Sequence, residues 1–304
     1  MQVTVTEKHH GVRLSSFLLG TLKISRSLLP RFKQERRILV NGVPTNVNYY
    51  LQVGDVVTVI TQDATASSEG LRLLHRHGIS VLWEDEDLLC LVKPQGLITH
   101  PTSHYQEGSL GEYVSRYLGA PFRPLNRLDV GTGGLLVAAK NAHAAARLVS
   151  LMREGRIAKT YLAFSAQKPT EEEGCSVFYT KPDPLRPSRR LLCEEGEGQR
   201  CETRFRYLGE ADGVNATLCH PVTGRTHQIR ITMARLGAPL LGDTAYADLM
   251  RSEAPAERED APLAIGLYAV HLTLPHPLSG EKLIFSLPHG LIPYPTDPAW
   301  HALW

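Results

Sequence analysis

Hydrophobic positions along this chain of 304 residues follow two kinds of spacing. Where they recur three and four residues apart, they predict helices at 11–22, 141–154 and 226–236. Gly237 suits the left-handed position that ends the last of these helices. Shorter apolar runs predict strands at 38–40, 56–60, 79–83, 88–92, 135–139, 160–164, 203–207, 214–220, 269–274 and 282–287.

The order of these elements indicates a fold class. Strands that follow one another with few helices between them favour an α+β protein with a mixed, largely antiparallel sheet. A stretch of small and polar residues separates two groups of elements and marks a domain boundary. We therefore predict a small α+β domain at 1–62, a linker at 63–70 and a larger domain at 71–304.

Composition excludes several classes of protein. The chain is 42% hydrophobic and 21% charged, which is typical of globular proteins rather than of disordered or collagen-like ones. Its five cysteines are scattered without a C-x-x-C pair, so neither a zinc site nor a disulfide framework is predicted. No apolar run approaches the ~18–20 residues that span a bilayer, and the first residues lack a signal-peptide pattern. We expect a monomeric, cytoplasmic protein that makes no contact with membranes.

The net charge of +2 conceals a basic N-terminal region. Residues 1–63 hold eight Lys or Arg against four Asp or Glu, a charge of +4, which leaves −2 for the remainder. Here Ser25 can cap a short helix, although Pro30 disfavours helical backbone at Leu29 and makes the start of the helix late or irregular. Around that helix lie five cations that suit contacts with the phosphates of a nucleic acid or form a solvated face: Arg26, Arg31, Lys33, Arg36 and Arg37.

The first candidate for chemistry is a carboxylate beside a glycine-rich turn. Asp129 follows Asn126 and Arg127 and precedes Thr132 within the sequence NRLDVGTGG. Glycines let the backbone approach a ligand closely, and a carboxylate there can act as a nucleophile or a base. The spacing does not match the dinucleotide-binding G-x-G-x-x-G. From spacing alone, a surface Asp129 paired with Arg127 before a hairpin is the favoured interpretation.

The second candidate is the turn TGRTHQIR at 223–230, which leads into a helix. His227 and Arg230 are three residues apart and are predicted to share a helix face, which suits an anion. The alternative is a plain amphipathic helix with solvated cations. Tyr161, at the start of a strand, can stack on a base or pack in the core, and packing is commoner. No histidine stands at metal-ligand spacing, so no metal site is predicted.

Taken together and in this order, these segments resemble the RluA-type RNA pseudouridine synthases. The resemblance runs from about 79 to 287, and five ordered motifs carry it: VLWEDEDLL with KPQGL and HP, RLD with GLL and AK, KTY at 159–161, GRTHQIR at 224–230, and GAPLLGD with Tyr246, His271 and His276. The basic head, with its SRS, VNG and GD segments, looks like the small αL RNA-binding domain found ahead of that catalytic domain.

The resemblance implies a fold, a reaction and roles for residues. The fold is the pseudouridine synthase sheet; the reaction cuts the bond between uracil N1 and ribose and rejoins the base through C5, which needs no cofactor. Asp129 would supply the carboxylate, Arg230 would hold it charged and oriented, and Tyr161 would stack on the uracil. Arg127 would fill the space of the flipped-out base. The remaining predicted substrate-binding residues are Asn126, Thr132, Arg225, His227 and Gln228.

The chain also departs from the family pattern within the catalytic motif. Asn126 stands where His is usual, Val130-Gly131 replaces a charged pair, and Gly133 replaces Ser or Thr. The two glycines are expected to loosen the loop that positions Asp129. Because Arg127 and Asp129 are present, we still expect activity.

We therefore expect an isomerase that converts uridines of structured RNA to pseudouridine. Large-subunit ribosomal RNA is the preferred substrate, and transfer RNA is the alternative. A non-catalytic RNA-binding or assembly factor that retains the fold is the rival from another class, favoured by the two glycines. A hydrolase that uses Asp129 lacks a second carboxylate in any motif.

Overall fold

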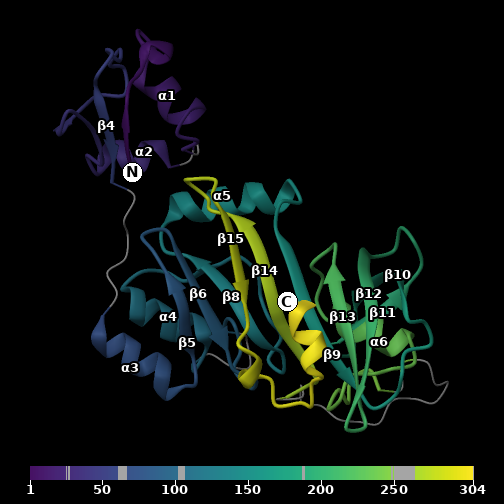
Figure 1. Ribbon diagram of the computed structural model, residues 1–304. Coiled ribbons are helices and arrows are strands. Elements are labelled where there is room, and N and C mark those ends of the chain that lie inside the picture. Colours follow the sequence, from purple (N-terminus) through teal and green to yellow (C-terminus); the bar gives the residue numbers. More distant parts are fainter. Residues whose placement is uncertain are drawn as a thin grey trace.

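A computed structural model describes residues 1–24, 26, 28–60, 67–101, 107–186, 189–247, 249 and 264–303 (Figure 1). The described residues form two sheets, one of four strands and one of eleven. The proposed cap Ser25 lies outside them, as do residues 63–66 of the predicted linker. Its described part, 67–70, is not a linker: Ser67 caps helix α3 (Ser68–Arg76) by accepting a hydrogen bond from the backbone N–H of Gly70.

The small sheet is built from the first 59 residues. Its strands are antiparallel in the order β1 (Gln2–Thr4), β4 (Val56–Val59), β2 (Ile38–Val40) and β3 (Val43–Pro44). A 3-10 turn (Glu7–His9) and helices α1 (Leu14–Gly20) and α2 (Leu29–Gln34) accompany it. Helix α2 starts late, as predicted, but Leu29 belongs to it, so the expected non-helical backbone at Leu29 is wrong: Pro30 lies in the first turn, where its missing N–H has no partner to lose. The cluster around Phe17, Phe32 and Val57 forms a core of its own.

The large sheet runs in the order β11-β10-β12-β13-β9-β14-β8-β6-β5, with β15 beside β14 and β7 beside β8. Its pairings are antiparallel among the described residues except the short parallel contact between β14 and β8, so the expected α+β class with a mixed, mostly antiparallel sheet is confirmed. The strand bounds are β5 (Ser80–Glu84), β6 (Leu88–Lys93), β7 (Arg123–Pro124), β8 (Gly133–Ala139), β9 (Ala158–Ser165), β10 (Glu173–Pro182), β11 (Arg190–Cys193), β12 (Gln199–Ala211), β13 (Val214–Pro221), β14 (Leu267–Pro275) and β15 (Lys282–Ser286).

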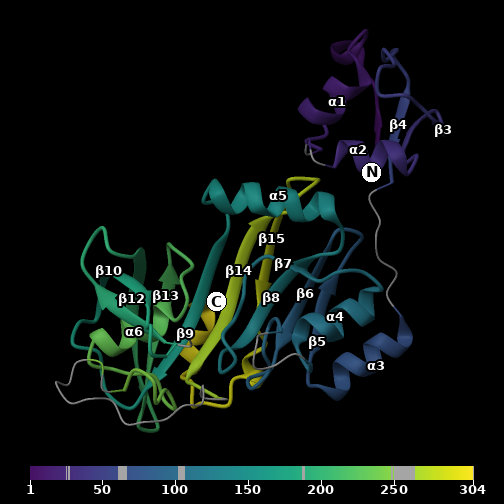
Figure 2. The same ribbon diagram turned by 180° about the vertical axis from the view of Figure 1, so that it is seen from behind.

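Helices cover different parts of this sheet (Figures 1 and 2). In both views α3 and α4 (Leu110–Leu118) lie at the β5–β6 end, and α6 (Gln228–Arg235) lies near β12. Helix α5 (Ala142–Arg153) runs across one end of the central strands. Two 3-10 segments, His289–Leu291 and Pro298–Leu303, close the described chain. No helix of the described ranges is both long and apolar enough to cross a bilayer.

The predicted strands and helices are all found, but the structure adds elements to them. Strands β3, β7, β10 and β11 and helices α3 and α4 were not predicted. Helix α6 begins at Gln228 rather than at 226, because His227 has a left-handed backbone with φ of 58°. His227 and Arg230 are therefore not two steps of one helix face, and their predicted common face is wrong.

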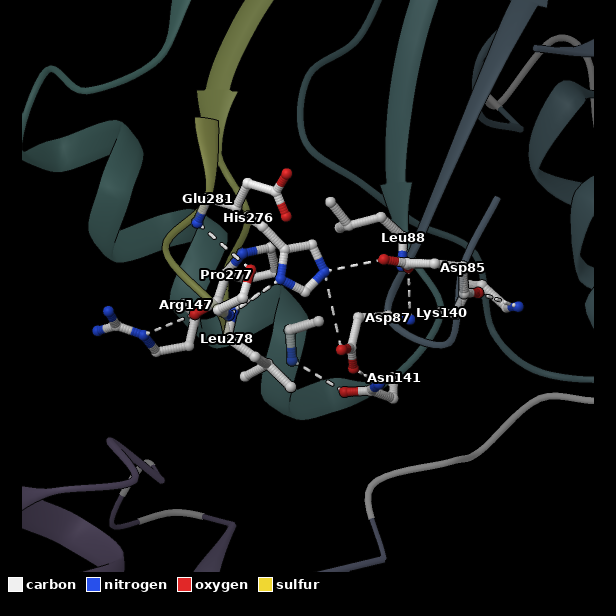
Figure 3. A network of polar contacts seen from close by, with 12 residues as sticks. Asp85, Asp87, Leu88, Lys140, Asn141, Arg147, His276, Pro277, Leu278 and Glu281 are labelled. Carbon is white, nitrogen blue, oxygen red and sulfur yellow. Dashed lines mark hydrogen bonds and ion pairs between the residues drawn. The ribbon is translucent and has the colours of Figure 1, made fainter. Parts of the chain in front are cut away.

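A polar network outside the predicted site fastens the β14–β15 hairpin to the neighbouring elements (Figure 3). Nε2 of His276 lies 2.9 Å from Oδ2 of Asp85, in the turn between β5 and β6. Asn141, which caps α5, donates to Oδ1 of Asp87 at 2.8 Å. Nδ1 of His276 accepts the backbone N–H groups of Leu278 and Ser279. The network joins three segments that are far apart in the sequence.

Candidate active site

A pocket of about 300 Å³ opens where three predicted motifs meet. The loop 125–132, the start of β9 and the turn 221–230 contribute its walls, joined by Met152 of α5 and Leu267 of β14. The predicted residues that line it are Asn126, Arg127, Asp129, Thr132, Tyr161, Arg225, His227, Gln228 and Arg230. The sequence motifs, up to a hundred residues apart, thus share one cavity.

The end of β6 and the residues after it form hydrogen bonds with the loop that carries Asp129. Nζ of Lys93 donates to the carbonyls of Pro94 and Leu97 at 2.9 and 2.7 Å and to that of Val130 at 3.3 Å. Lys93 is completely buried. Burial lowers the pKa of Lys93 to about 7, while the negative charge of Asp129 acts in the opposite direction. Lys93 therefore ties the backbone beside Asp129 to the sheet.

The glycines in this loop do not loosen it, which corrects our expectation. Gln95 Nε2 donates to the Gly131 carbonyl at 2.9 Å, and the same carbonyl accepts the N–H of Ile265 at 3.1 Å. A Cβ at Gly133 would lie 2.7 Å from the ring of Tyr268. The small residue therefore permits the close approach of β14 to β8, and the loop is tied down on both sides.

Arg230 contacts a different carboxylate from the one that the resemblance implied. Its guanidinium forms a bidentate pair with Asp243, both contacts at 2.7 Å, and both side chains are buried. Burial opposes the charge, but the hydrogen bonds and charge of Asp243, with a further contribution from Asp129, leave the pKa of Arg230 raised. Asp243 thus engages Nε and Nη2 of Arg230, whereas the interaction between Arg230 and Asp129 that the structure supports is one between their charges.

Among the described residues, the ring of His227 faces the carboxylate of Asp129 at short range. Its Nε2 lies 4.0 Å from Oδ2 of Asp129. Burial lowers the pKa of His227 to about 4, against the raising effect of the Asp129 charge. The ring is therefore neutral at ordinary pH. Asp129 itself remains partly exposed, its side chain at 29%, and so is accessible from the pocket.

Tyr161 lies on β9 with its side chain among the residues that line the pocket. It is 7% exposed. Burial first, and the charge of Asp129 second, raise the pKa of its phenol, so the hydroxyl stays protonated. A neutral aromatic ring beside a carboxylate is suited to stack on a planar base.

The remaining predicted residues divide into two groups. Gln228 is corrected: its amide donates to the Glu202 carbonyl and Thr203, and accepts from Thr223 and the Arg225 N–H, so it builds the turn rather than binding substrate. In contrast, Oδ1 of Asn126 and Oγ1 of Thr132 are buried without a hydrogen-bond partner among the described residues. Arg127 and Arg225 are exposed at the rim of the pocket.

Comparison with known proteins places this site in a family. The family profile described as RNA pseudouridylate synthase matches residues 87–235, which include the Asp129 loop, the start of β9 and the 223–230 turn. Ribosomal large subunit pseudouridine synthase C of Pasteurella multocida is 30% identical, over 94% of this chain and 89% of its own. The chain belongs to the RluA-type RNA pseudouridine synthases. It is an isomerase of RNA.

Further relatives agree. The uncharacterized RNA pseudouridine synthase YlyB of Bacillus subtilis is 27% identical over 95% of this chain and 94% of its own. The human RNA pseudouridylate synthase domain containing 4 is a structural neighbour, with a TM-score of 0.55 and 23% identity, over 74% of this chain and 94% of that chain. The structural likeness shows that the catalytic sheet is the same fold.

Several residues that complete this synthase site had no role in the sequence interpretation. In the sequence, Asp243 and Tyr246 belong to a C-terminal motif and Lys93 and Gln95 to the opening motif, and no role follows for them from the sequence alone. Their role is to hold the groups that line the pocket. The signal that could have found them is a charged or polar residue inside an otherwise apolar segment, as with Lys93 directly after LLCLV.

Proposed function

We propose that this pseudouridine synthase acts on ribosomal RNA of the large subunit, in the cytoplasm, with Asp129 as its catalytic carboxylate. The observation that carries the proposal is the convergence on Asp129: a neutral His227 and a neutral Tyr161 surround it, and the buried Arg230–Asp243 pair lies close enough for Asp129 to affect the pKa of Arg230. The relatives named for the large ribosomal subunit support the choice of substrate.

The target uridine would enter the pocket as a flipped-out nucleotide. Unpartnered acceptors at Asn126 and Thr132 are available to its hydrogen-bonding edge, and Tyr161 is available to its face. Arg127, exposed at the rim, is placed to fill the position that the base leaves. These roles support recognition of one uridine rather than of a helix in general.

The test is pseudouridine mapping of total RNA from cells that lack the protein, complemented with wild type or with Asp129→Ala. We expect one or a few sites to disappear from large-subunit RNA and to return only with the wild type. If a transfer RNA site is lost instead, the proposed substrate is wrong and the proposed reaction stands. If no site is lost, or if Asp129→Ala restores the lost site, the proposal fails.

We also propose that residues 1–62 form a separate RNA-binding domain ahead of a catalytic domain at 71–304. Two hydrophobic clusters support this division, one within residues 5–59 and one within residues 74–300. Arg26, Lys33 and Arg36 are exposed on the small domain, while Arg31 and Arg37 both contact Glu35. Removing residues 1–63 should weaken RNA binding and reduce its dependence on salt. An unchanged salt slope would contradict the assignment.

A further inference from the structure

Three polar groups from distant parts of the chain form a line that ends at the pocket. The backbone N–H of Arg190, at the start of β11, donates to the hydroxyl of Tyr246 at 2.9 Å. That hydroxyl lies 2.8 Å from Nδ1 of His227. On the other side of the ring, Nε2 of His227 lies 4.0 Å from Oδ2 of Asp129.

The positions of the protons in this line follow from the hydrogen bonds. The Tyr246 hydroxyl accepts from Arg190, and its own proton needs an acceptor because the side chain is fully buried. Nδ1 of His227 is the acceptor within reach. If Nδ1 carried the proton instead, the hydroxyl would accept twice and its own proton would be left without a partner, at a cost. Nδ1 is therefore unprotonated.

The other end of the ring gives the same answer independently. A neutral histidine with an unprotonated Nδ1 carries its proton on Nε2, which faces Asp129. The opposite tautomer would aim a lone pair at a carboxylate. Burial also keeps the second proton off the ring, although Asp129 and Asp243 favour it, and Arg190 and Arg230 oppose it. Both ends therefore select the Nε2–H form.

We propose that His227 is a positioning residue that presents an Nε2–H donor to Oδ2 of Asp129, and that Tyr246 fixes the tautomer which makes this possible. The inference rests on the proposed function of Asp129 and deepens it. At 4.0 Å the donor and carboxylate are not hydrogen-bonded in this structure, and under the proposal the bond forms when the uridine occupies the pocket. The donor then orients Asp129 so that Oδ1 faces the nucleotide.

The first arm of the test reads the tautomer without any RNA. Nitrogen-15 NMR of the histidine-labelled full chain distinguishes protonated from unprotonated ring nitrogens, and the His227 signals are those absent from the His227→Gln protein. We expect Nε2 protonated and Nδ1 unprotonated, and a mixture in Tyr246→Phe. A protonated Nδ1 in the wild type overturns the proposal. Because no activity is involved, this arm stands even if the RNA is wrongly assigned.

The second arm uses side chains that reproduce one nitrogen each. The amide nitrogen of Gln at 227 can replace Nε2, whereas that of Asn reaches only the position of Nδ1. Asn tolerates the left-handed backbone of residue 227 better, so a structural role alone predicts that Asn is the milder change. We expect the reverse for turnover: His227→Gln within about threefold of wild type, and His227→Asn at least about tenfold lower in kcat with KM unchanged.

The substrate for this arm is total RNA from cells that lack the protein. Tyr246→Phe should lower kcat about tenfold in the wild type and should have no further effect in His227→Gln, where no tautomer remains to be fixed. Tyr207→Phe is the matched control, because its hydroxyl also contacts a buried partner, Asn215, away from the pocket. Equal kcat for the Gln and Asn variants, or an additive effect of Tyr246→Phe, would overturn the inference. An inactive wild type would instead overturn the proposed function.

Discussion

Two histidine–carboxylate pairs among the described residues differ in distance: the closed pair, His276 and Asp85, is in contact, whereas the open pair, His227 and Asp129, is separated. His276 lies 2.9 Å from Asp85, and Asn141 donates a hydrogen bond to the adjacent Asp87, so this pair is in direct contact within a polar network of the protein (Figure 3). His227 stands 4.0 Å from Asp129, and the space around the pair belongs to the pocket. In both rings Nδ1 is occupied by a hydrogen bond from the protein.

The pKa directions of the two histidines follow this difference. The Asp85 contact raises the pKa of His276 in spite of burial. Burial without a closed contact lowers the pKa of His227 to about 4. Asp85 already interacts with its histidine and so stabilises the folded protein. Asp129 makes no such close contact, so its carboxylate can interact with a substrate. This contrast supports the proposal that the first pair stabilises the fold and the second takes part in catalysis.

The largest expected effect on the free energy of unfolding concerns Lys93, which holds the backbone beside Asp129 of the open pair. Lys93→Met removes a buried donor from the carbonyls of Pro94, Leu97 and Val130, of which that of Val130 keeps the N–H of Gly96, so we expect the free energy of unfolding to fall by about 3 kcal/mol. Urea unfolding of the full chain measures this. A fall below about 0.5 kcal/mol would show that the loop does not depend on Lys93. Lys168→Met, an exposed lysine paired with Glu172, is the control.

The next effect is the pH dependence of stability that His227 of the open pair contributes. The pKa of His227 is lowered from 6.5 to about 4 in the folded protein, so the unfolded chain binds more protons between these values. Folding stability therefore falls as the pH is lowered through this window. Between pH 7 and pH 5 the wild type should lose about 2 kcal/mol more than His227→Gln in urea unfolding. If the free energy of unfolding depends on pH in the same way in both proteins, the claim that His227 is neutral in the folded protein is wrong.

The smallest effect belongs to the closed pair. Asp85→Asn removes the charge facing His276, and because Asp85 is 32% exposed we expect a loss of only about 1 kcal/mol in unfolding free energy. Turnover per folded molecule should stay within about twofold of wild type. Asp212→Asn, on an exposed turn, controls for the removal of one negative charge. A large loss of turnover would show that the pair of Asp85 and His276 is needed for catalysis, which contradicts the account.

Most strands of the large sheet could be predicted from the sequence, and so could the segments that line the pocket, because short runs of neighbouring residues specify both. Apolar runs such as LLCLV and GLLVAA specify buried strands, and the motif around Asp129 is continuous in the chain. Helix α3 was missed because it begins in Ser67–Gly70, whose small polar residues also suit a linker. Only the structure shows the Ser67 cap and the packing of Gly70 against Tyr117.

The supporting contacts could not be predicted for a different reason. The hydrogen bond from Arg190 to Tyr246 joins positions 56 residues apart, and no spacing rule connects them. The partner of Arg230 was wrongly expected to be Asp129, since nothing in the sequence ranks that carboxylate against Asp243. The left-handed backbone of His227, which turns its ring toward Asp129, is likewise visible only in three dimensions.

The central claim is that the open carboxylate performs the reaction and the closed one does not. Because the base is rejoined through C5, turnover releases the hydrogen of that carbon, and RNA tritiated at uracil C5 measures it directly. With such RNA from cells lacking the protein, wild type and Asp85→Asn should release tritium, while Asp129→Asn should be slower by at least about 10³-fold although it is folded. Comparable release by Asp129→Asn and wild type would contradict the account.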